Sequence, residues 1–351
     1  MSIKRSPLLI SFLISSSAFA NSSPQMVLDD ELLISEIKNA VPLKRVEPKY
    51  PIQAAKRGQE GWTEVSFIVE KDGSVSSAIV EDSSGSKEFN KASLRAIKKW
   101  RYQPAVEDGE PVQQCNQSVR LDYSLGGEEQ RGASRRFVAS YKEISALIEA
   151  GKLGEAQERL SKLRNKTKWN LYEDAWFWNL SSQYYRVTND KANQLKSVNR
   201  VLSARGFAPN DMRLRALVDA FILNYNGVSY AKALANFEQI KKAQNSETTV
   251  ATLQPYVNKL HSLIAGDKPI VKASVIENQH RWRHLLVRNR FALEDVSGQL
   301  SKLEIRCKNK VFSYNAAAQN TWVIPRKWQQ CYVYIDGTDN TQFKFVELAN
   351  S

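Results

Sequence analysis

The sequence of 351 residues lacks any run of the roughly 18–20 apolar residues that a membrane-spanning helix needs, which excludes a polytopic membrane protein. Glycine and proline are sparse, with 15 and 11 residues, and 42% of the chain is hydrophobic. This composition excludes collagen-like, low-complexity and wholly disordered chains. At about 100–200 residues per domain, the length predicts two or three domains.

Side chains suited to catalysis are also few. His280 and His284 are spaced so that they would place two metal ligands on one turn of a helix. No cysteine or carboxylate near them completes a metal site, and Arg281 and Arg283 would repel a cation. The sequence contains no nucleophile elbow and no glycine-rich phosphate loop after a strand. It therefore predicts a protein that is not an enzyme and holds no cofactor or metal; a cell-wall hydrolase would need convergent groups that the sequence does not show.

The first 20 residues have the pattern of a secretory signal peptide. Lys4 and Arg5 precede a short apolar run, and Ala18-Phe19-Ala20 is a small-x-small cleavage site. The pattern predicts cleavage after Ala20 and export of the mature chain. The alternative is an uncleaved anchor that keeps the chain at the inner membrane, facing the periplasm.

Positive charge exceeds negative charge, and the formal net charge is +13. Without Lys4 and Arg5 the net charge is +11, and the excess lies late in the chain, because residues 126–265 carry +8 and residues 266–351 carry +5. A solvated basic surface accounts for these cations, and an anionic envelope partner is the alternative. Nucleic acid is not expected as a partner of an exported chain.

Cysteine occurs three times, and export favours pairing. Cys307 ends the alternating run 303–307 and Cys331 begins the run 331–335. Antiparallel neighbours would bring these two cysteines within disulfide reach. The sequence predicts a Cys307–Cys331 disulfide and leaves Cys115 as the odd thiol.

Residues 42–125 carry the most informative pattern. The predicted elements are a short helix at 52–57, strands at 62–69 and 75–80, a helix at 89–100 and a last strand within 112–125. Asp72-Gly73 favours a hairpin between the first two strands. A small sheet with a helix on one face leaves at least one strand edge open.

This stretch resembles the TonB C-terminal domain family. The residues that carry the resemblance are Pro48, Tyr50-Pro51, Ala54, Gly61, Val65, Phe67, Val69, Asp72-Gly73, Val75, Val80, Ser83-Ser84-Gly85, Phe89, Ala92, Ala96, Trp100-Arg101-Tyr102, Pro104-Ala105, Gly109 and Pro111-Val112. They follow one another in the family's order and cover about a quarter of the chain.

The resemblance implies a periplasmic recognition domain whose last strand pairs with a short segment of an outer-membrane TonB-dependent receptor. Carried over to this sequence, the partner-binding edge would comprise Ser118, Val119, Arg120, Leu121, Asp122, Tyr123, Ser124 and Leu125. Tyr50 and Pro51 would order the adjoining loop. The same edge could bind another envelope protein or a second copy of the chain. Alternatively, Val119, Leu121 and Tyr123 only bury one face of the sheet.

The sequence departs from the family before residue 42. Family members resemble tethered rods, with a membrane anchor that contacts ExbB and ExbD and a long Pro-rich spacer. Here residues 21–47 contain only Pro24 and Pro42 and reach about 90 Å when fully extended. The resemblance implies ExbB and ExbD as partners, whereas this departure favours an accessory TonB-domain protein over the energy transducer itself.

Residues 136–265 are helical and repetitive. Ala156, Ala192 and Ala233 align with steps of 36 and 41 residues, and the units resemble degenerate tetratricopeptide repeats. An unrelated helical bundle is the alternative. Five aromatic residues of this region are expected to belong to its hydrophobic core: Trp169, Trp176, Phe177, Trp178 and Tyr184.

The predicted fold class is α+β multidomain. Its parts are a signal peptide at 1–20, an N-terminal segment at 21–41, a small α/β TonB-like domain at 42–125, a linker at 126–135, a helical repeat region at 136–265 and a small antiparallel β domain at 270–351. Asp336-Gly337 predicts a hairpin in the last domain, and the linker predicts that the helical region acts independently. Two functions are expected: a receptor-binding adaptor that supports TonB-dependent transport, or an envelope scaffold whose repeats are the main binding surface.

Overall fold

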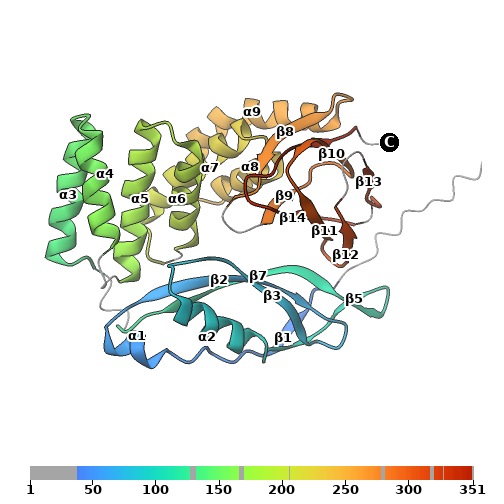
Figure 1. Cartoon of the computed structure of the whole chain (residues 1–351), viewed down its shortest axis with the longest axis horizontal. Helices are drawn as coiled ribbons and strands as arrows, with labels where there is room; N and C mark the ends of the chain where they lie inside the picture. Colours follow the sequence, from blue (N-terminus) through green and yellow to red (C-terminus); the bar gives the residue numbers. More distant parts are fainter. Residues whose placement is uncertain are drawn as a thin grey trace, which may run out of the picture. The chain divides into compact units, whose positions relative to one another are not determined.

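The computed structural model describes residues 38–126, 132–165, 170–204, 206–277, 281–316, 320–326 and 328–349. The predicted signal peptide, most of the segment 21–41 and Trp169 lie outside the described residues. Residues 37–351 form one compact unit, and its elements follow the chain in Figure 1 from an α/β domain through helices to β-strands. The α+β multidomain prediction is confirmed.

The N-terminal α/β domain is built on a three-stranded antiparallel sheet with the order β3-β2-β7. Its elements are β1 (Val41–Lys44), α1 (Ile52–Lys56), β2 (Gly61–Val69), β3 (Val75–Ser83), α2 (Lys87–Ile97), β4 (Arg101–Gln103), β5 (Ala105–Glu107), β6 (Glu110–Val112) and β7 (Gln114–Tyr123). Helix α2 crosses one face of the sheet (Figure 1) and buries Ile97 against Val65 and Phe67. Gly73 turns the β2–β3 hairpin with φ +76°, and any side chain there would collide with the Tyr102 carbonyl.

One predicted boundary in this domain is wrong. The helix predicted through Trp100 ends at Ile97, and residues 101–103 pair with β1 instead. The last strand, predicted within 112–125, is β7 at Gln114–Tyr123, and Val112 belongs to a β5–β6 hairpin before it. Asp108 and Gly109 turn that hairpin with φ values of +53° and +84°.

Seven helices form the middle region, drawn as successive hairpins in Figure 1. They are α3 (Arg135–Glu149), α4 (Leu153–Arg164), α5 (Leu171–Val187), α6 (Lys191–Ser203), α7 (Asn210–Asn226), α8 (Tyr230–Lys241) and α9 (Glu247–Ala265). Side chains of Ser134, Asn170 and Asp190 accept hydrogen bonds at the N-termini of α3, α5 and α6, which satisfies exposed backbone donors there.

The predicted repeat alignment is wrong at Ala192. Ala156 and Ala233 are fully buried as the fourth residues of α4 and α8, whereas Ala192 is exposed as the second residue of α6. Gln194 holds the fourth, buried position in α6, so the structural steps are 38 and 39 residues. The likeness to tetratricopeptide repeats stays a prediction. Three residues of the predicted aromatic set are buried in the helical core, namely Phe177, Trp178 and Tyr184. Trp176, a fourth member of the set, packs against that core.

The C-terminal region consists of two four-stranded antiparallel sheets with the orders β13-β10-β15-β8 and β12-β11-β14-β9. The strands are β8 (Ile270–Val275), β9 (Arg281–Leu285), β10 (Arg290–Ser297), β11 (Leu300–Arg306), β12 (Val311–Asn315), β13 (Thr321–Val323), β14 (Tyr332–Gly337) and β15 (Gln342–Glu347). Both sheets contribute to one core, which joins Phe291 and Phe345 to Leu303 and Val333.

The predicted Asp336-Gly337 hairpin is wrong. Strand β14 pairs with β11 and β9, whereas β15 pairs with β10 and β8, so the connection carries the chain from one sheet to the other. Residues 338–341 lengthen the connection, and Asn340 turns it with φ +65°.

Cys307 and Cys331 form a disulfide. Cys307 directly follows β11, and Cys331 directly precedes β14. The last pair of those strands, Arg306 opposite Tyr332, brings the two cysteines together. Cys115 is a buried free thiol in β7, and burial raises its pKa to about 12. The thiol is therefore neutral at physiological pH.

His284 lies on strand β9 and not on a helical turn, because residues 281–285 pair with β14. His280 lies outside the described residues. The His284 Nε2 atom hydrogen-bonds Glu347 Oε1 at 2.9 Å, and Glu347 Oε2 also accepts from the amides of Val287 and Arg288. The ring is therefore part of a buried polar cluster of the β region.

Acid is expected to weaken the fold through His284. Burial lowers the pKa of His284, against the raising effect of Glu347, so folding favours the neutral ring. The free energy of unfolding should fall as pH drops below about 6.5, where the unfolded chain binds a proton first, by at most about 1.4 kcal/mol per pH unit. Urea unfolding at pH 7.5 and 5.5 should show a smaller acid loss for His284→Gln than for the parent. An equal loss in both chains would contradict this assignment.

Candidate partner-binding edge

Strand β7 lies at one edge of the N-terminal sheet. It pairs antiparallel with β2, with Gly61 opposite Tyr123 and Ser66 opposite Ser118. Among the described residues, β2 is its only strand neighbour. The strand spans Gln114–Tyr123, so Ser124 and Leu125 of the predicted edge lie beyond its end.

One face of β7 belongs to the core of the domain. Tyr123 is 2% exposed and stacks on Phe89 of α2 with ring centroids 4.3 Å apart. Its hydroxyl lies 2.8 Å from Ser93 Oγ. Leu121 is buried in the neighbouring cluster, against which Val119 packs. The alternation predicted for these three side chains therefore describes the helix-covered face.

The loop before α1 reaches this face of the strand. The Tyr50 ring meets those of Phe89 and Tyr123 edge to face, with both centroid distances 5.7 Å. The Tyr50 hydroxyl donates a 2.6 Å hydrogen bond to the Gln59 carbonyl, and Pro51 directly precedes α1. Burial, with a smaller contribution from the charge of Glu60, raises the pKa of Tyr50 to about 12. The structure thus brings the predicted loop and strand residues together.

The helical region covers the opposite face of β7 at Arg120. The Arg120 side chain is only 10% exposed, and its guanidinium stacks 4.4 Å above the ring centroid of Trp62. Arg120 also donates to Asp122 at 2.7 Å and to Ser203 of α6 at 2.9 Å. On this face, therefore, Arg120 is held against the protein, whereas Ser118 and Asp122 are exposed.

Trp62 joins the N-terminal sheet to the helices. It is fully buried, and its indole N–H donates a 2.8 Å hydrogen bond to Asp174 of α5. Arg200 of α6 forms two hydrogen bonds with Asp82 of β3, at 2.9 and 2.6 Å, and lies 4.1 Å from the ring centroid of Trp178. Such bidentate contacts are directional and hold the two regions together at these residues.

These contacts contradict the expectation that the helical region is independent of the N-terminal domain. The C-terminal sheets touch the same domain, because Arg283 of β9 forms an ion pair with Glu81 of β3. The residues that sequence reasoning missed are Trp62, Arg200 and Arg283. The sequence did contain a signal that this strand face is covered. Trp62 and Ile68 are large apolar residues, and they lie on the same strand face as Glu64.

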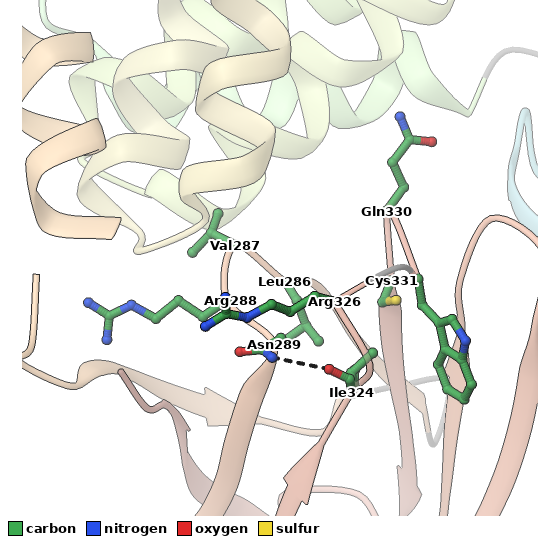
Figure 2. A pocket seen from close by; sticks show the side chains of 9 residues that line it. Leu286, Val287, Arg288, Asn289, Ile324, Arg326, Gln330 and Cys331 are labelled. Atoms are coloured by element: carbon green, nitrogen blue, oxygen red, sulfur yellow. Dashed lines mark hydrogen bonds between the residues drawn. The ribbon is translucent and has the colours of Figure 1, made fainter. Parts of the chain in front are cut away.

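A hollow of about 450 Å³ lies in the C-terminal region (Figure 2). Arg288 lines it, but the Arg288 guanidinium already donates to five backbone carbonyls. Asn289 donates to the Ile324 carbonyl, as the dashed line in Figure 2 shows.

No group of three or more metal-ligating side chains occurs in the described part of the chain. Over those same ranges, no helix is long and apolar enough to cross a membrane.

Comparison with known proteins identifies the N-terminal domain. Residues 46–125 match the family model described as the C-terminal region of the Gram-negative bacterial TonB protein. This stretch is a TonB C-terminal domain. The match confirms the resemblance predicted for residues 42–125 and contains the whole of β7.

Three curated relatives match the TonB domain. Protein TonB of Vibrio cholerae is 35% identical over 75 residues, which cover 21% of this chain and 31% of the relative. Protein TonB of Pseudomonas aeruginosa is 37% identical over 78 residues, covering 22% of each. Protein tonB2 of Pseudomonas aeruginosa is 34% identical over 87 residues, covering 25% of this chain and 32% of the relative. The chain thus spans less than a third of the length of these relatives.

Two solved structures are also similar. The solution structure of the Pseudomonas aeruginosa TonB C-terminal domain is 30% identical, covers 29% of this chain and 94% of that one, and has a TM-score of 0.23. The tonb2 protein of Vibrio anguillarum is 30% identical, covers 33% of this chain and 99% of that one, and has a TM-score of 0.22.

Proposed function

We propose that this chain is a periplasmic, non-enzymatic protein that supports TonB-dependent transport by binding an extended segment of an outer-membrane receptor, or of another envelope protein, along β7. The observation that carries the proposal is the position of β7 in a TonB domain. From residue 117 to residue 123, the strand has β2 as its only strand neighbour among the described residues. Its outer backbone groups are therefore available for pairing.

Strand addition suits this edge physically. Main-chain hydrogen bonds from β7 would supply affinity, and the exposed side chains of Ser118 and Asp122 would contact alternate residues of the partner. The core-facing residues Leu121 and Tyr123 and the stacked Arg120 hold the strand in place before the partner arrives. A preordered edge lowers the entropy cost of binding. Coupling to ExbB and ExbD would depend on residues before Lys38, which lie outside the described ranges.

A second candidate function is an envelope scaffold in which the helical region is the main binding surface. One observation favours it: the helices and the TonB domain are joined by Trp62 and Arg200, so the TonB domain could serve as a fixed docking base. Exposed apolar side chains such as Ile222 and Tyr256 lie on the helices and could contact a partner. In that case, changes at β7 would leave partner binding intact.

Proline substitution along β7 is expected to weaken receptor capture. Gln117→Pro and Ser118→Pro each remove one amide donor at neighbouring positions, so one of the two falls on the outer edge. Loss of one hydrogen bond should reduce capture roughly two- to twelvefold relative to Gln117→Ala and Ser118→Ala. Capture is measured with a photo-crosslinking residue at Asp122 in intact cells, and mass spectrometry identifies the adduct.

The fold of each variant is checked by circular dichroism. An adduct with an outer-membrane TonB-dependent receptor that weakens in one folded proline variant supports strand addition. Unchanged capture by both folded proline variants would overturn it and favour the helical surface.

A further inference from the structure

The backbone at the start of β7 is already bonded on its outer side. The Cys115 amide donates a 2.8 Å hydrogen bond to the carbonyl of Lys308 in the C-terminal region. An amide N–H carries a single hydrogen, so this donor cannot also pair with an added strand at full strength. Cys115 is 2% exposed, which leaves no room for another chain beside it.

Asn116 also bonds to the C-terminal region, and together with Cys115 it blocks the pairing of another strand at the start of β7. Its side-chain amide donates to the carbonyls of Arg306 and Gln330, at 2.8 and 3.1 Å. Its backbone has φ +59°, and the pairing of β7 with β2 shifts register at this point, so the residue forms a bulge. A bulge bends an edge away from regular pairing. Residues on both sides of Asn116 therefore cannot belong to one continuous docking ladder.

The segments that supply these carbonyls are held firmly. The Cys307–Cys331 disulfide joins them, and the Lys308 amide donates 2.8 Å to the Gln329 carbonyl. A second backbone bond, from Cys307 to Lys310, closes the turn around Lys308 at 2.8 Å. The block at Cys115 and Asn116 is thus part of an ordered and covalently closed structure.

The other end of the edge is fixed by the end of β7 at Tyr123. The Leu125 amide donates a 2.8 Å hydrogen bond to the Glu60 carboxylate, and Ser124 Oγ donates to the Gly126 carbonyl at 3.1 Å. Strand β7 ends at Tyr123, and the backbone bends at Leu125 and Gly126. The stretch that remains for pairing is residues 117–123.

We propose that the disulfide-closed end of the C-terminal β region is a stop that confines a docked partner to residues 117–123 of β7. This inference rests on the proposed function. It assigns the partner's chemistry as one extended segment of an envelope protein, of about seven residues and about 23 Å at roughly 3.3 Å per residue. The stop sets both the length and the register of that segment, because pairing cannot slide past Asn116.

The test uses the full chain in intact cells with a photo-crosslinking residue placed singly at Gln113, Ser118 or Asp122. Partner adducts should form from Ser118 and Asp122 and be roughly tenfold weaker from Gln113, which corresponds to about one lost hydrogen bond. Asn116→Gly keeps the positive φ but removes both side-chain hydrogen bonds. In that variant the Gln113 adduct should rise toward the level of the Ser118 adduct, whereas Asn245→Gly, the same change at an exposed positive-φ residue between α8 and α9, should leave the pattern unchanged.

If Asn116→Gly leaves the hydrogen bond from the Cys115 amide to the Lys308 carbonyl in place, a second variant is needed. Cys307→Ser combined with Cys331→Ser opens the turn, and hydrogen exchange at the Cys115 amide reports whether the stop has been released. Release with a new Gln113 adduct supports the proposal. Equal adducts from Gln113 and Ser118 in the parent chain, or release without a new Gln113 adduct, overturn the stop alone. An adduct only with a second copy of this chain overturns the assigned partner, and the absence of adducts at every position overturns strand addition itself.

Discussion

Replacing Trp62 by alanine is expected to lower the free energy of unfolding by about 3–5 kcal/mol, the usual cost of removing a large buried aromatic side chain. Trp62 is fully buried, with Arg120 stacked on its ring at 4.4 Å and Arg200 at 5.7 Å. The substitution would also leave an acceptor oxygen of Asp174 without this bond, because the indole N–H donates to that carboxylate. The loss thus combines a cavity, two cation–π contacts and one hydrogen bond.

Trp62→Phe is the matched control. It keeps an aromatic ring beneath the two arginines but removes part of the buried ring volume and the bond to Asp174, which still accepts from the Trp178 indole at 3.1 Å. A loss of about 1–2 kcal/mol is expected for this variant. Urea unfolding of the full chain measures both changes, and hydrogen exchange in α5 and α6 reports whether the TonB domain has separated from the helices. A loss below about 1 kcal/mol for Trp62→Ala would show that this contact does not hold the two regions together.

Local signals explain why the TonB domain could be predicted from the sequence. The Asp72-Gly73 turn needs no distant partner, and the Ser86 side chain caps α2 through the Phe89 amide three residues away. The family motifs repeat the same local information, which is why the order of strands and helix is right. The predicted end of the second helix is wrong because residues 101–103 pair with β1, and such pairing between short, distant strands has no local signal.

The surroundings of β7 could not be predicted, because they depend on contacts between distant residues. Arg200 meets Asp82 across 118 positions, and Asn116 meets the Gln330 carbonyl across 214. Alternation in β2 predicts one buried and one solvent-facing side, yet nearly every residue of that strand is buried. Charged residues such as Arg200 are usually exposed, and only the three-dimensional fold shows which of them pair in the interior.

The C-terminal region shows the same limit in a different way. The sequence predicts a small antiparallel β domain here, but its Asp336-Gly337 turn signal predicts a hairpin, whereas β14 pairs with β11 and β15 pairs with β10. A turn reverses the chain within a few residues, but it does not determine whether the next strand joins the same sheet or a facing one. Here burial of Phe343 and Phe345 in the shared core decides for the facing sheet.

Arg288→Met is expected to destabilise the joint between α9 and the C-terminal sheets by roughly 3–5 kcal/mol. Arg288 is 3% exposed, and its guanidinium donates to the carbonyls of Leu263 and Ile264 at the end of α9, at 2.7 and 3.0 Å. It also donates to Gly266 at 2.6 Å, so a cation neutralises the negative end of the helix dipole there.

Methionine fills a similar volume but donates no hydrogen bonds, so these carbonyls would be buried without partners. Arg288→Lys restores the charge without the planar fork and should recover only part of the loss. Urea unfolding measures the stabilities of both variants, and hydrogen exchange should rise first at the C-terminal turn of α9 and at Val287, whose amide bonds Glu347 beside Arg288. A Met variant as stable as the parent would mean that water replaces the guanidinium at these carbonyls, and the joint would then depend on its apolar contacts alone.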